Sequence, residues 1–234
     1  MLTGLHALLA VSTRADADEL LDSGTLTTRE VEENLADLAR LNRLPGGTST
    51  SIRAIRSLLN GAADASILDV GTGRADMPIS FARAGWRSVA VDANPQVARI
   101  ARRVTERHAD IQVVDGDARH LPFVDGTFDV AHCSLLLHHL DPDEAVAVLR
   151  ELRRVARHGV VVNDLRRGVL PLLATVASTA VLGRSRVTRA DGLASARRSY
   201  TVPELDRFLE RAGLRPRWRS VAWMPRVVTA AVRS

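Results

Sequence analysis

Apolar positions along the chain follow two different periods, and the change between them predicts two parts. Up to residue 62 they recur three or four residues apart, which indicates amphipathic helices. The first begins at a capping box, Thr27-Thr28-Arg29-Glu30, and stops at Leu44-Pro45-Gly46-Gly47. A second runs from Ile52 and is closed by Asn60-Gly61. We therefore expect an N-terminal helical cap over residues 1–62 and a larger domain over residues 63–234.

From Ser66 onward, short apolar runs alternate with helical patterns. The predicted strands are Ile67–Val70, Ser88–Asp92, Ile111–Val114, Phe128–His132 and Val160–Asn163. The helices between them start where a capping side chain stands near a proline, at Asp76-Met77-Pro78, Asn94-Pro95 and Asp141-Pro142. This alternation predicts a parallel sheet with helices on both faces.

The pattern changes after the fifth predicted strand. An uncharged helix, Val169–Leu182, is followed by an arginine-rich loop, and Thr201-Val202-Pro203-Glu204 caps a further helix. Two last strand-like runs, Trp218–Trp223 and Arg226–Val232, are so close together that they predict an antiparallel hairpin. The segment near residues 166–200 is either a helical lid over an apolar substrate or ordinary core, and we favour the lid. Its arginines either bind an acidic group or form a solvated loop; they are Arg184, Arg186, Arg189, Arg197 and Arg198.

Composition narrows the classes of function. The 234 residues carry a formal net charge of +5, but acidic residues are interleaved with the arginines and no basic tail is present. This favours a protein with a mildly positive surface over a nucleic-acid binder. The single Cys133 rules out an intramolecular disulfide and fits a reducing compartment. Met1–Ala10 lacks a basic region and a cleavage site, and Val169–Leu182 is shorter than a membrane span. We expect a cytoplasmic monomer or homodimer.

The most informative stretch runs from Ile67 to Asp76. An apolar strand passes through Asp69 into a turn with glycines at positions 71 and 73, and a helix follows. Such a turn lets a ligand approach the backbone closely and aims a helix N-terminus at it. It suits NAD or S-adenosylmethionine alike.

Two further aspartates follow at the ends of the next predicted strands. Asp92 lies where a carboxylate can bind two ribose hydroxyls. Asp117 can accept a hydrogen bond from an exocyclic amine while the Ala118 N–H reaches a ring nitrogen. Aspartates at strand ends often only cap turns, but three of them beside a G-x-G turn favour a nucleotide-like ligand.

This set of motifs resembles the class I S-adenosylmethionine-dependent methyltransferases, from about Ser66 to the C-terminus. The matching runs are D-V-G-T-G (69–73), V-D-A-N-P (91–95), G-D-A (116–118), F-D-V-A-H-C-S-L-L-L-H-H-L (128–140) and L-R-E-L-R-R-V-A-R-H-G (149–159). The family's usual third glycine is Ala75 here. The resemblance implies a Rossmann-like α/β fold, a seven-stranded mostly parallel sheet of order 3-2-1-4-5-7-6. It is strongest for the small-molecule branch that acts on quinones and polyketides.

The resemblance also implies a role for each matching position. Asp69, Gly71 and Gly73 would hold the methionine part of S-adenosylmethionine, Asp92 the ribose, and Asp117 with Ala118 the adenine. Ser134 and Leu135 would face the methyl-bearing side, and Thr72 and Ala93 complete the cofactor-binding set.

Histidines near the fourth predicted strand are the candidates for catalysis. His139 and His138 can titrate near neutral pH where substrate would approach, although either could instead be structural. With His132 and Cys133 they match no standard zinc spacing, so we expect no metal. Asn163 and Asp164 are expected to face the pocket, with Asp164 capping a turn, pairing with Arg166 or acting on substrate.

The sequence therefore predicts methyl transfer to oxygen or carbon of a small, largely apolar acceptor of polyketide, phenol or quinone type. A nicotinamide-dependent oxidoreductase is less favoured because Asp76 stands where its fingerprint has a third glycine. An RNA methyltransferase would share the cofactor site, but amino-methylating enzymes of that kind carry N-P-P-Y or D-P-P-Y after strand four, where this chain has His132-Cys133-Ser134-Leu135. A catalytically silent scaffold with this fold also stays open.

Overall fold

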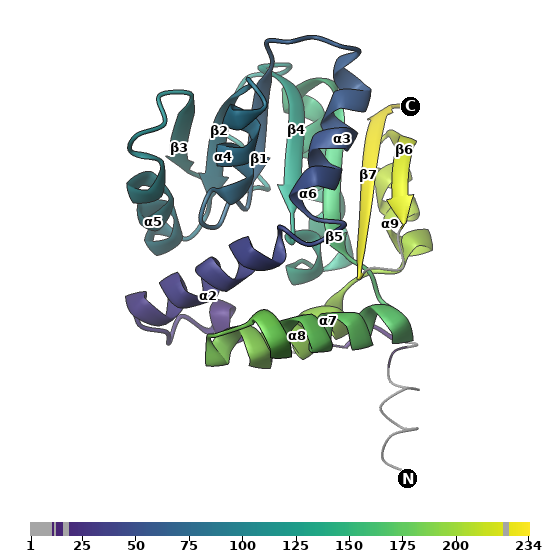
Figure 1. Cartoon of the computed structure of the whole chain (residues 1–234). Helices are drawn as coiled ribbons and strands as arrows, with labels where there is room; N and C mark the ends of the chain where they lie inside the picture. The colour runs from purple at the N-terminus through teal and green to yellow at the C-terminus, as the bar shows by residue number, and fades with distance from the viewer. Residues whose placement is uncertain (1–10, 12, 16–18, 222–224) are drawn as a thin grey trace.

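A computed structural model describes residues 11, 13–15, 19–221 and 225–234 of the chain. The described strands form one seven-stranded sheet of order β3-β2-β1-β4-β5-β7-β6 (Figure 1). Only β7 runs antiparallel to its neighbours, which confirms both the predicted order and the terminal hairpin. The strands are β1 (Ser66–Val70), β2 (Arg87–Asp92), β3 (Ile111–Asp115), β4 (Phe128–Ser134), β5 (Ala156–Leu165), β6 (Leu214–Val221) and β7 (Arg226–Arg233).

Helices cover both faces of the sheet, as the alternating pattern predicts. Helices α3 (Thr48–Leu59) and α4 (Asp76–Arg83) bury Ile55 and Phe81 against one face. On the other face, α6 (Pro142–Val155) and α9 (Val202–Arg211) pack over the larger core. Helix α5 (Pro95–Thr105) lies on the same face as α4, because both follow right-handed crossovers in one direction along the sheet, and it packs against β2 and β3. Helix α3, which we expected within the N-terminal cap, contributes directly to the core of the sheet.

A second group of helices lies below the carboxyl ends of the parallel strands (Figure 1). It consists of the 3-10 turn η1 (Leu20–Ser23), α2 (Thr28–Leu41), α7 (Val169–Leu182) and α8 (Arg186–Arg198). The capping box of Thr27 and Glu30 forms as predicted at the start of α2. We call η1, α2, α7 and α8 the cover, because they lie over the edge of the sheet where ligands of open α/β folds bind.

Three sequence-based expectations about these elements are wrong. Residues 186–198 form helix α8 rather than a loop, because Ser185 caps it by accepting a hydrogen bond from the Val187 N–H. Asp76 does not cap α4; the N-cap is Ala75, and the Asp76 carboxylate instead accepts a hydrogen bond from Asn42 Nδ2 at 2.8 Å. The third wrong expectation is that α7 turns its apolar face toward the acceptor. Met1–Ala10 and Trp223 with Met224 lie outside the described residues.

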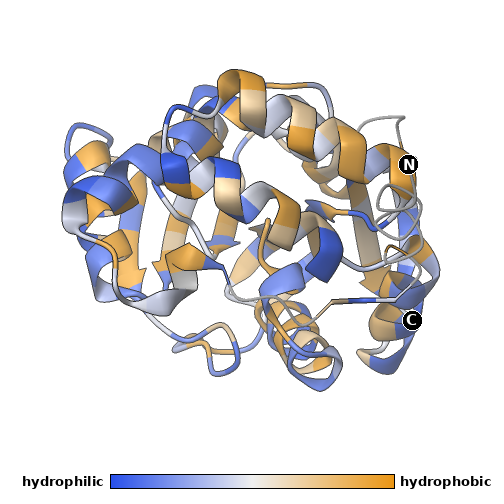
Figure 2. Ribbon diagram, turned by 90° about the horizontal axis from the view of Figure 1, so that it is seen from below, coloured by the Kyte–Doolittle hydropathy of each residue, from blue (hydrophilic) through white to orange (hydrophobic). Residues whose placement is uncertain are grey.

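Helix α7 turns its polar side toward the cavity and much of its apolar side toward solvent. We expected its apolar face to enclose the acceptor, yet its residues Thr175, Ser178 and Thr179 point inward while Leu170 and Val181 are 71% and 80% exposed. Figure 2 views the molecule from this side and colours it by hydropathy. The inner side of the lid is therefore polar. Among the described residues, no helix combines the length and apolarity that crossing a membrane requires.

Candidate active site

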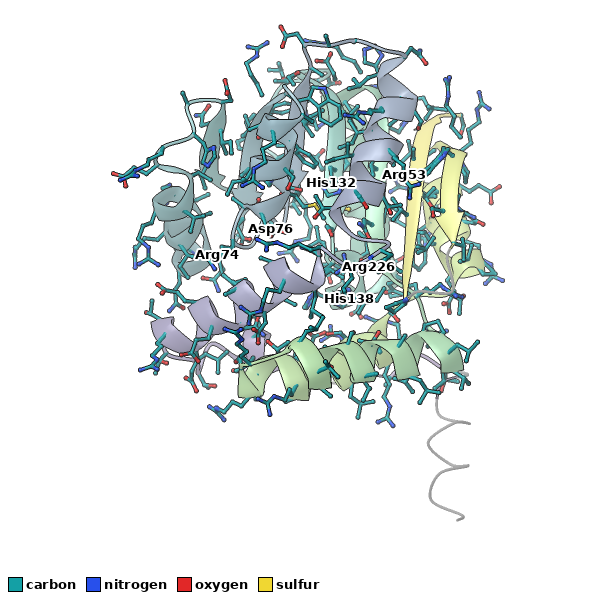
Figure 3. The ribbon with its side chains drawn as sticks, in the orientation of Figure 1. Arg53, Arg74, Asp76, His132, His138 and Arg226 are labelled. Carbon is teal, nitrogen blue, oxygen red and sulfur yellow. The ribbon has the colours of Figure 1, made fainter. Side chains whose placement is uncertain are left out.

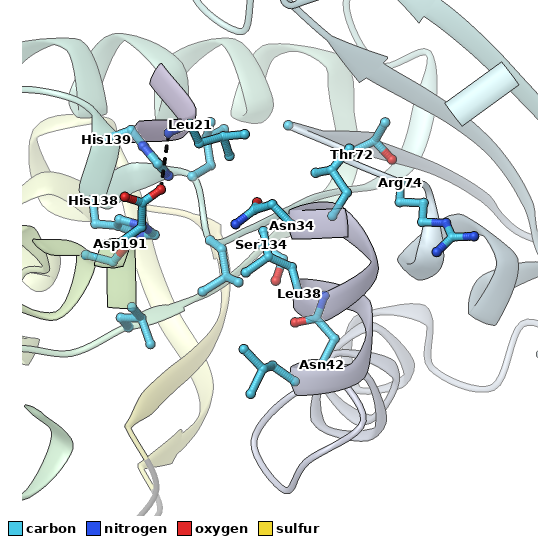
Figure 4. Close-up of a pocket in the computed structure, with 18 of the residues that line it drawn as sticks. Leu21, Asn34, Leu38, Asn42, Thr72, Arg74, Ser134, His138, His139 and Asp191 are labelled. Carbon is cyan, nitrogen blue, oxygen red and sulfur yellow. Dashed lines mark hydrogen bonds between the residues drawn. The ribbon is translucent and has the colours of Figure 1, made fainter. Parts of the chain in front are cut away.

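A cavity of about 450 Å³ lies between the carboxyl edge of the sheet and the cover (Figure 4). Its wall on the sheet side contains all but one of the predicted cofactor-binding residues, namely Asp69, Gly71, Thr72, Gly73, Asp92, Ala93, Ala118, Ser134 and Leu135. His138 and His139 also line it. On the cover side are Asn34 and Leu38 of α2 and Asp191 of α8. The volume is within the usual range for small-molecule sites.

The glycine turn is shaped for close approach of a ligand. Gly71 and Gly73 have φ of 69° and 55°, and a Cβ at Gly71 would meet Leu136 at 3.0 Å. The N–H groups of Gly71 and Thr72 donate to the Val91 carbonyl at 2.9 and 3.1 Å, which joins the turn to β2. Ala75, at the position of the family's usual third glycine, adopts φ of 61°, a left-handed backbone that glycine adopts more easily than alanine.

Asp69 is held in a buried network at the end of β1. Its Oδ2 accepts from Thr72 Oγ1 and its Oδ1 contacts His132 Nδ1, each at 2.6 Å. The register of β1 on β4 places Asp69 directly opposite His132. The other ring nitrogen of His132 lies 2.9 Å from Ser51 Oγ, which also accepts from Asn163 Nδ2. His132 and Asn163 therefore position Asp69 and do not line the cavity, contrary to our expectation for Asn163.

Asp92 ends β2 with its carboxylate at the cavity. Its Oδ2 accepts from the Gly73 N–H and its Oδ1 from the Asn94 N–H, both at 3.0 Å. Burial raises the pKa of this carboxyl to about 6, against these two backbone hydrogen bonds, and the charges of Asp69 and Asp115 act in the same direction as burial. Each oxygen of the Asp92 carboxylate accepts one backbone N–H, so each can still accept a hydrogen bond from a ligand hydroxyl.

Asp117 is the predicted cofactor-binding residue that does not line the cavity. Its carboxylate forms a bidentate pair with Arg119, which also contacts Glu144 at 2.7 Å. The hydrogen bond from Arg119 lowers the pKa of Asp117. Its neighbours Gly116 and Ala118 do line the cavity. To accept a hydrogen bond from adenine as predicted, the Asp117 carboxylate would have to give up its hydrogen bonds from Arg119.

Ser134 is the last residue of β4, Leu135 follows it, and both line the cavity. Ser134 Oγ is buried and has no hydrogen-bond partner. Leu135 has φ of 54°, an uncommon conformation for a residue with a branched side chain, and its N–H donates to Asn163 O at 2.9 Å. Strain of this kind is frequent at functional sites. The orphaned hydroxyl and the glycine turn fit a bound S-adenosylmethionine.

His138 is fixed by a buried carboxylate. Its Nδ1 lies 2.6 Å from Asp164 Oδ1, and Asp164 also accepts from the N–H groups of Leu137 and Leu165, both at 2.7 Å. Burial acts to raise the pKa of Asp164, but the His138 interaction and these hydrogen bonds outweigh it, so the pKa is lowered. Asp164 thus caps the turn η2 (Leu137–His139), as one of our alternatives had it, and lies behind His138 instead of lining the cavity.

Glu19 completes this part of the site, and the sequence analysis did not identify it. Its Oε1 lies 3.8 Å from His138 Nε2 and 3.8 Å from His139 Nδ1. The residue is 4% exposed, and Oε1 has no hydrogen-bond partner. The three ligand-type atoms lie within 4.8 Å of one another, a grouping that could in principle hold a cation. Because no local motif links Glu19 to the histidines, only the fold reveals the cluster.

The arginine-rich segment mostly holds the cover together. Arg186 donates to Glu30 at 2.6 Å, and Arg198 donates to the His139 carbonyl at 2.7 Å. The carboxylate of Asp191 accepts from the N–H groups of Leu20 and Leu21, which ties η1 to α8. The segment is thus a helix and not the expected loop, although Arg184, Arg186 and Arg189 are exposed to solvent. Arg226, at the start of β7, is a further cavity residue that the sequence analysis did not single out.

Comparisons with known proteins agree with this geometry. Residues 67–159 match the model of a methyltransferase domain. The demethylmenaquinone methyltransferase of Streptomyces avermitilis is 30% identical over 184 residues, which cover 73% of this chain and 75% of that protein. That of Thermobifida fusca is 30% identical over 165 residues, which cover 67% of this chain and 70% of that protein.

Solved structures share the fold. A SAM-dependent methyltransferase from Aquifex aeolicus matches with a TM-score of 0.62 at 17% identity, covering 88% of this chain and 98% of that chain. The magnesium protoporphyrin IX methyltransferase of Synechocystis, solved with bound SAH, matches with a TM-score of 0.60 at 16% identity, covering 99% of this chain and 95% of that chain.

The strand order, the glycine turn and the cavity at the carboxyl edge define a Rossmann-like methyltransferase. The chain belongs to the class I S-adenosylmethionine-dependent methyltransferase family. It is an enzyme, and its cofactor is S-adenosylmethionine. Family membership decides against the nicotinamide-dependent alternative.

Proposed function

We propose that this enzyme methylates an oxygen, or a carbon beside one, of a small and largely apolar acceptor with an acidic hydroxyl, such as a phenol, an enol or a hydroquinone. The observation that carries the proposal is the Glu19, His138 and His139 cluster on the cavity wall. It offers a proton acceptor next to the strand end where the methyl group would lie. The relatives named above as demethylmenaquinone methyltransferases support a quinone-like acceptor.

His139 is the proton acceptor in this proposal. Its side chain lines the cavity and is 21% exposed to solvent, whereas that of His138 is 3% exposed and its Nδ1 is engaged by Asp164. Glu19 would stabilise the positive charge that His139 gains, because its carboxylate is buried and close to both rings. Asp164 and His138 position the cluster.

The bound cofactor supplies an activated methyl group on a sulfonium, so orientation provides most of the remaining catalysis. The predicted cofactor-binding residues keep their roles as part of this proposal. In this proposal Ser134 and Leu135 determine how deep in the cavity the methyl-bearing sulfonium lies. Asp92 and the glycine turn determine the orientation of the cofactor. We further propose that the cover, formed by the segment before α3 and by residues 166–200, shapes the acceptor compartment.

A panel of acceptors tests this function. The enzyme with radiolabelled S-adenosylmethionine should methylate 1-naphthol, 1,4-dihydroxynaphthalene or an alkylresorcinol, and leave matched anilines and unstructured RNA unlabelled. Labelling of the amines or of the RNA, with none of the phenols modified, would contradict the proposal.

A further inference from the structure

Arg226 is a buried cation that has no hydrogen-bond or ion-pair partner among the described residues. It is 7% exposed, lines the cavity, and its Nη1 is buried with no hydrogen-bond partner. Burying a guanidinium without a counter-ion is costly, so such a group is retained where something else pairs with it. Figure 3 shows Arg226 at the lower edge of the sheet, in the same region as Asp76 and His138.

A comparison with Arg167 shows what a structural buried arginine looks like in this chain. Arg167 is also 7% exposed, but it donates to the Ser199 carbonyl at 2.7 Å and to Glu204 at 2.8 Å. Arg226 forms neither kind of contact within the described part of the chain. Its role is therefore not explained by the packing of the protein alone.

The two carboxylates whose charges act on Arg226 through space are already engaged elsewhere. Asp164 bonds to His138 and to two backbone N–H groups, and Asp76 accepts from Asn42. Burial lowers the pKa of Arg226 to about 10, while the charges of Asp164 and Asp76 act through space in the opposite direction. The guanidinium thus keeps its charge near neutral pH, with hydrogen-bond donors left over.

The strand order places Arg226 beyond the cofactor groove. The predicted cofactor-binding residues end strands β3, β2, β1 and β4, whereas Arg226 starts β7 opposite Leu165, the last residue of β5. Along the carboxyl edge of the sheet, the predicted adenine site at β3 comes first, the methyl-bearing side at Ser134 of β4 follows, and Arg226 of β7 lies beyond β5. This end of the cavity is where the acceptor must lie to meet the methyl group in line.

We propose that Arg226 binds an anionic oxygen of the methyl acceptor, so that the acceptor is an acid: a carboxylate, or a phenol or enol bound in its ionised form. A guanidinium suits such an oxygen because its planar fork donates two parallel hydrogen bonds. The inference rests on the proposed function and narrows its substrate class. In this inference the positive charge of Arg226 stabilises the oxyanion that the acceptor becomes on losing its proton. The same charge disfavours binding of a protonated amine.

The test uses thermal unfolding of the whole protein saturated with S-adenosylhomocysteine, with benzoate and its neutral isostere benzamide as probes. Benzoate should raise the melting temperature of the wild type and benzamide should not, because only the anion pairs with the guanidinium. Arg226→Met should abolish the benzoate response. Arg233→Met, at the exposed far end of β7, is the matched control and should retain it.

Arg226→Lys keeps the charge without the fork and should weaken benzoate binding by about tenfold. Arg226→Met alone, without benzoate, should unfold at the same or a higher temperature than the wild type, because a buried unpaired charge is removed. A large drop in its melting temperature would mean that Arg226 is structural and would overturn the inference, as would equal responses of the wild type to both probes.

The remaining outcome concerns the carboxylate of the cofactor itself. If Arg226→Met and Arg226→Lys bind S-adenosylhomocysteine at least about tenfold more weakly by calorimetry and keep the benzoate response, Arg226 serves the cofactor and the inference is wrong. Failure of the acceptor panel with a normal benzoate response would instead contradict the proposed function alone.

Discussion

Oδ1 of Asp164 lies 2.6 Å from Nδ1 of His138, and this contact ties the end of β5 to the turn that carries both candidate catalytic histidines. Because a carboxylate accepts only, Nδ1 must carry the proton, and Nε2 of His138 points toward Glu19. The pair fixes the orientation of the turn, so that His139 meets the cavity with a buried carboxylate beside it. Three titratable groups, Glu19, His138 and His139, thus stand on the wall where the acceptor is expected, and Asp164 lies behind them.

The first prediction concerns the proton acceptor. His139→Ala should lower kcat on the acceptor found in the panel by about a hundredfold, a usual contribution of general base catalysis, with cofactor affinity unchanged. Glu19→Gln, which removes the negative charge but keeps the shape, should lower kcat by about tenfold. His108→Ala, in the turn before β3, is the control. Unchanged turnover in His139→Ala would make this histidine structural. Loss of turnover on treatment with EDTA, regained with zinc, would instead assign the cluster to a metal.

The second prediction concerns Asp92. Asp92→Ala should weaken S-adenosylmethionine binding by at least about tenfold in calorimetry, because two ribose hydroxyls would lose a charged acceptor. Asp115→Ala is a matched control: Asp115 pairs in register with Asp92 on the neighbouring strand but does not line the cavity. Equal affinities for the wild type and Asp92→Ala would sink the ribose assignment.

The raised pKa of Asp92 gives the third prediction. Its carboxyl must be ionised to accept from hydroxyl groups, so affinity for S-adenosylmethionine should fall as the pH drops through about 6. A fall of about tenfold is expected by about pH 5, and Asp92→Asn should abolish this dependence. The same shift destabilises the unliganded protein as the pH rises to about 6, because the unfolded chain releases this proton more easily. A flat pH profile for the wild type would contradict the prediction.

The fourth prediction separates backbone strain from ligand contact at Gly71. Gly71→Ala places a Cβ at the glycine turn and should reduce S-adenosylhomocysteine affinity by at least about tenfold. Gly61→Ala imposes the same kind of strain, with φ of 88° and no atom within 4 Å of the new Cβ, far from the cavity. Both variants should unfold at somewhat lower temperatures, but only the first should lose ligand. Similar affinities for the two would make the turn merely structural.

The fifth prediction concerns nucleic acids. Arg186 pairs with Glu30 and Arg198 donates to the His139 carbonyl, so neither of these two arginines is an uncommitted cation. We expect no binding of tRNA or duplex DNA in fluorescence anisotropy at about 150 mM salt, since contacts with phosphates would need several uncommitted cations. Micromolar binding with a steep salt dependence would revive the RNA methyltransferase alternative.

Local patterns were enough to predict the parallel strands and to place the glycine turn and Asp92 at their carboxyl ends. The strands carry alternating or continuous apolar runs, and Gly71, Gly73 and Asp92 stand next to each other in chain order along the sheet edge. The segment before residue 199 was harder, because arginine and alanine favour helices while Gly192 and the high charge suggested a loop. Ser185, a residue type that is common at helix N-caps, was the local signal for a helix starting at Arg186.

The acceptor end of the site could not be predicted in the same way. Glu19, His138 and Arg226 come from three distant parts of the chain, and only tertiary packing brings them to one cavity. Asp164 was expected at the cavity but lies behind His138, because the turn η2 folds over it and donates the Leu137 N–H. A charged residue opening the apolar run Arg226–Val232 was the one visible hint, since such strand positions are usually apolar.

The outward apolar residues of α7 imply that this helix is loosely anchored. Its buried positions are Pro171, Leu172, Thr175 and Thr179, so docking removes little hydrocarbon from water and local opening should cost little free energy. Its amide hydrogens should therefore exchange with deuterium much faster than those of β4 and β5. Such breathing would give an apolar acceptor a way in that does not require the sheet or the glycine turn to move.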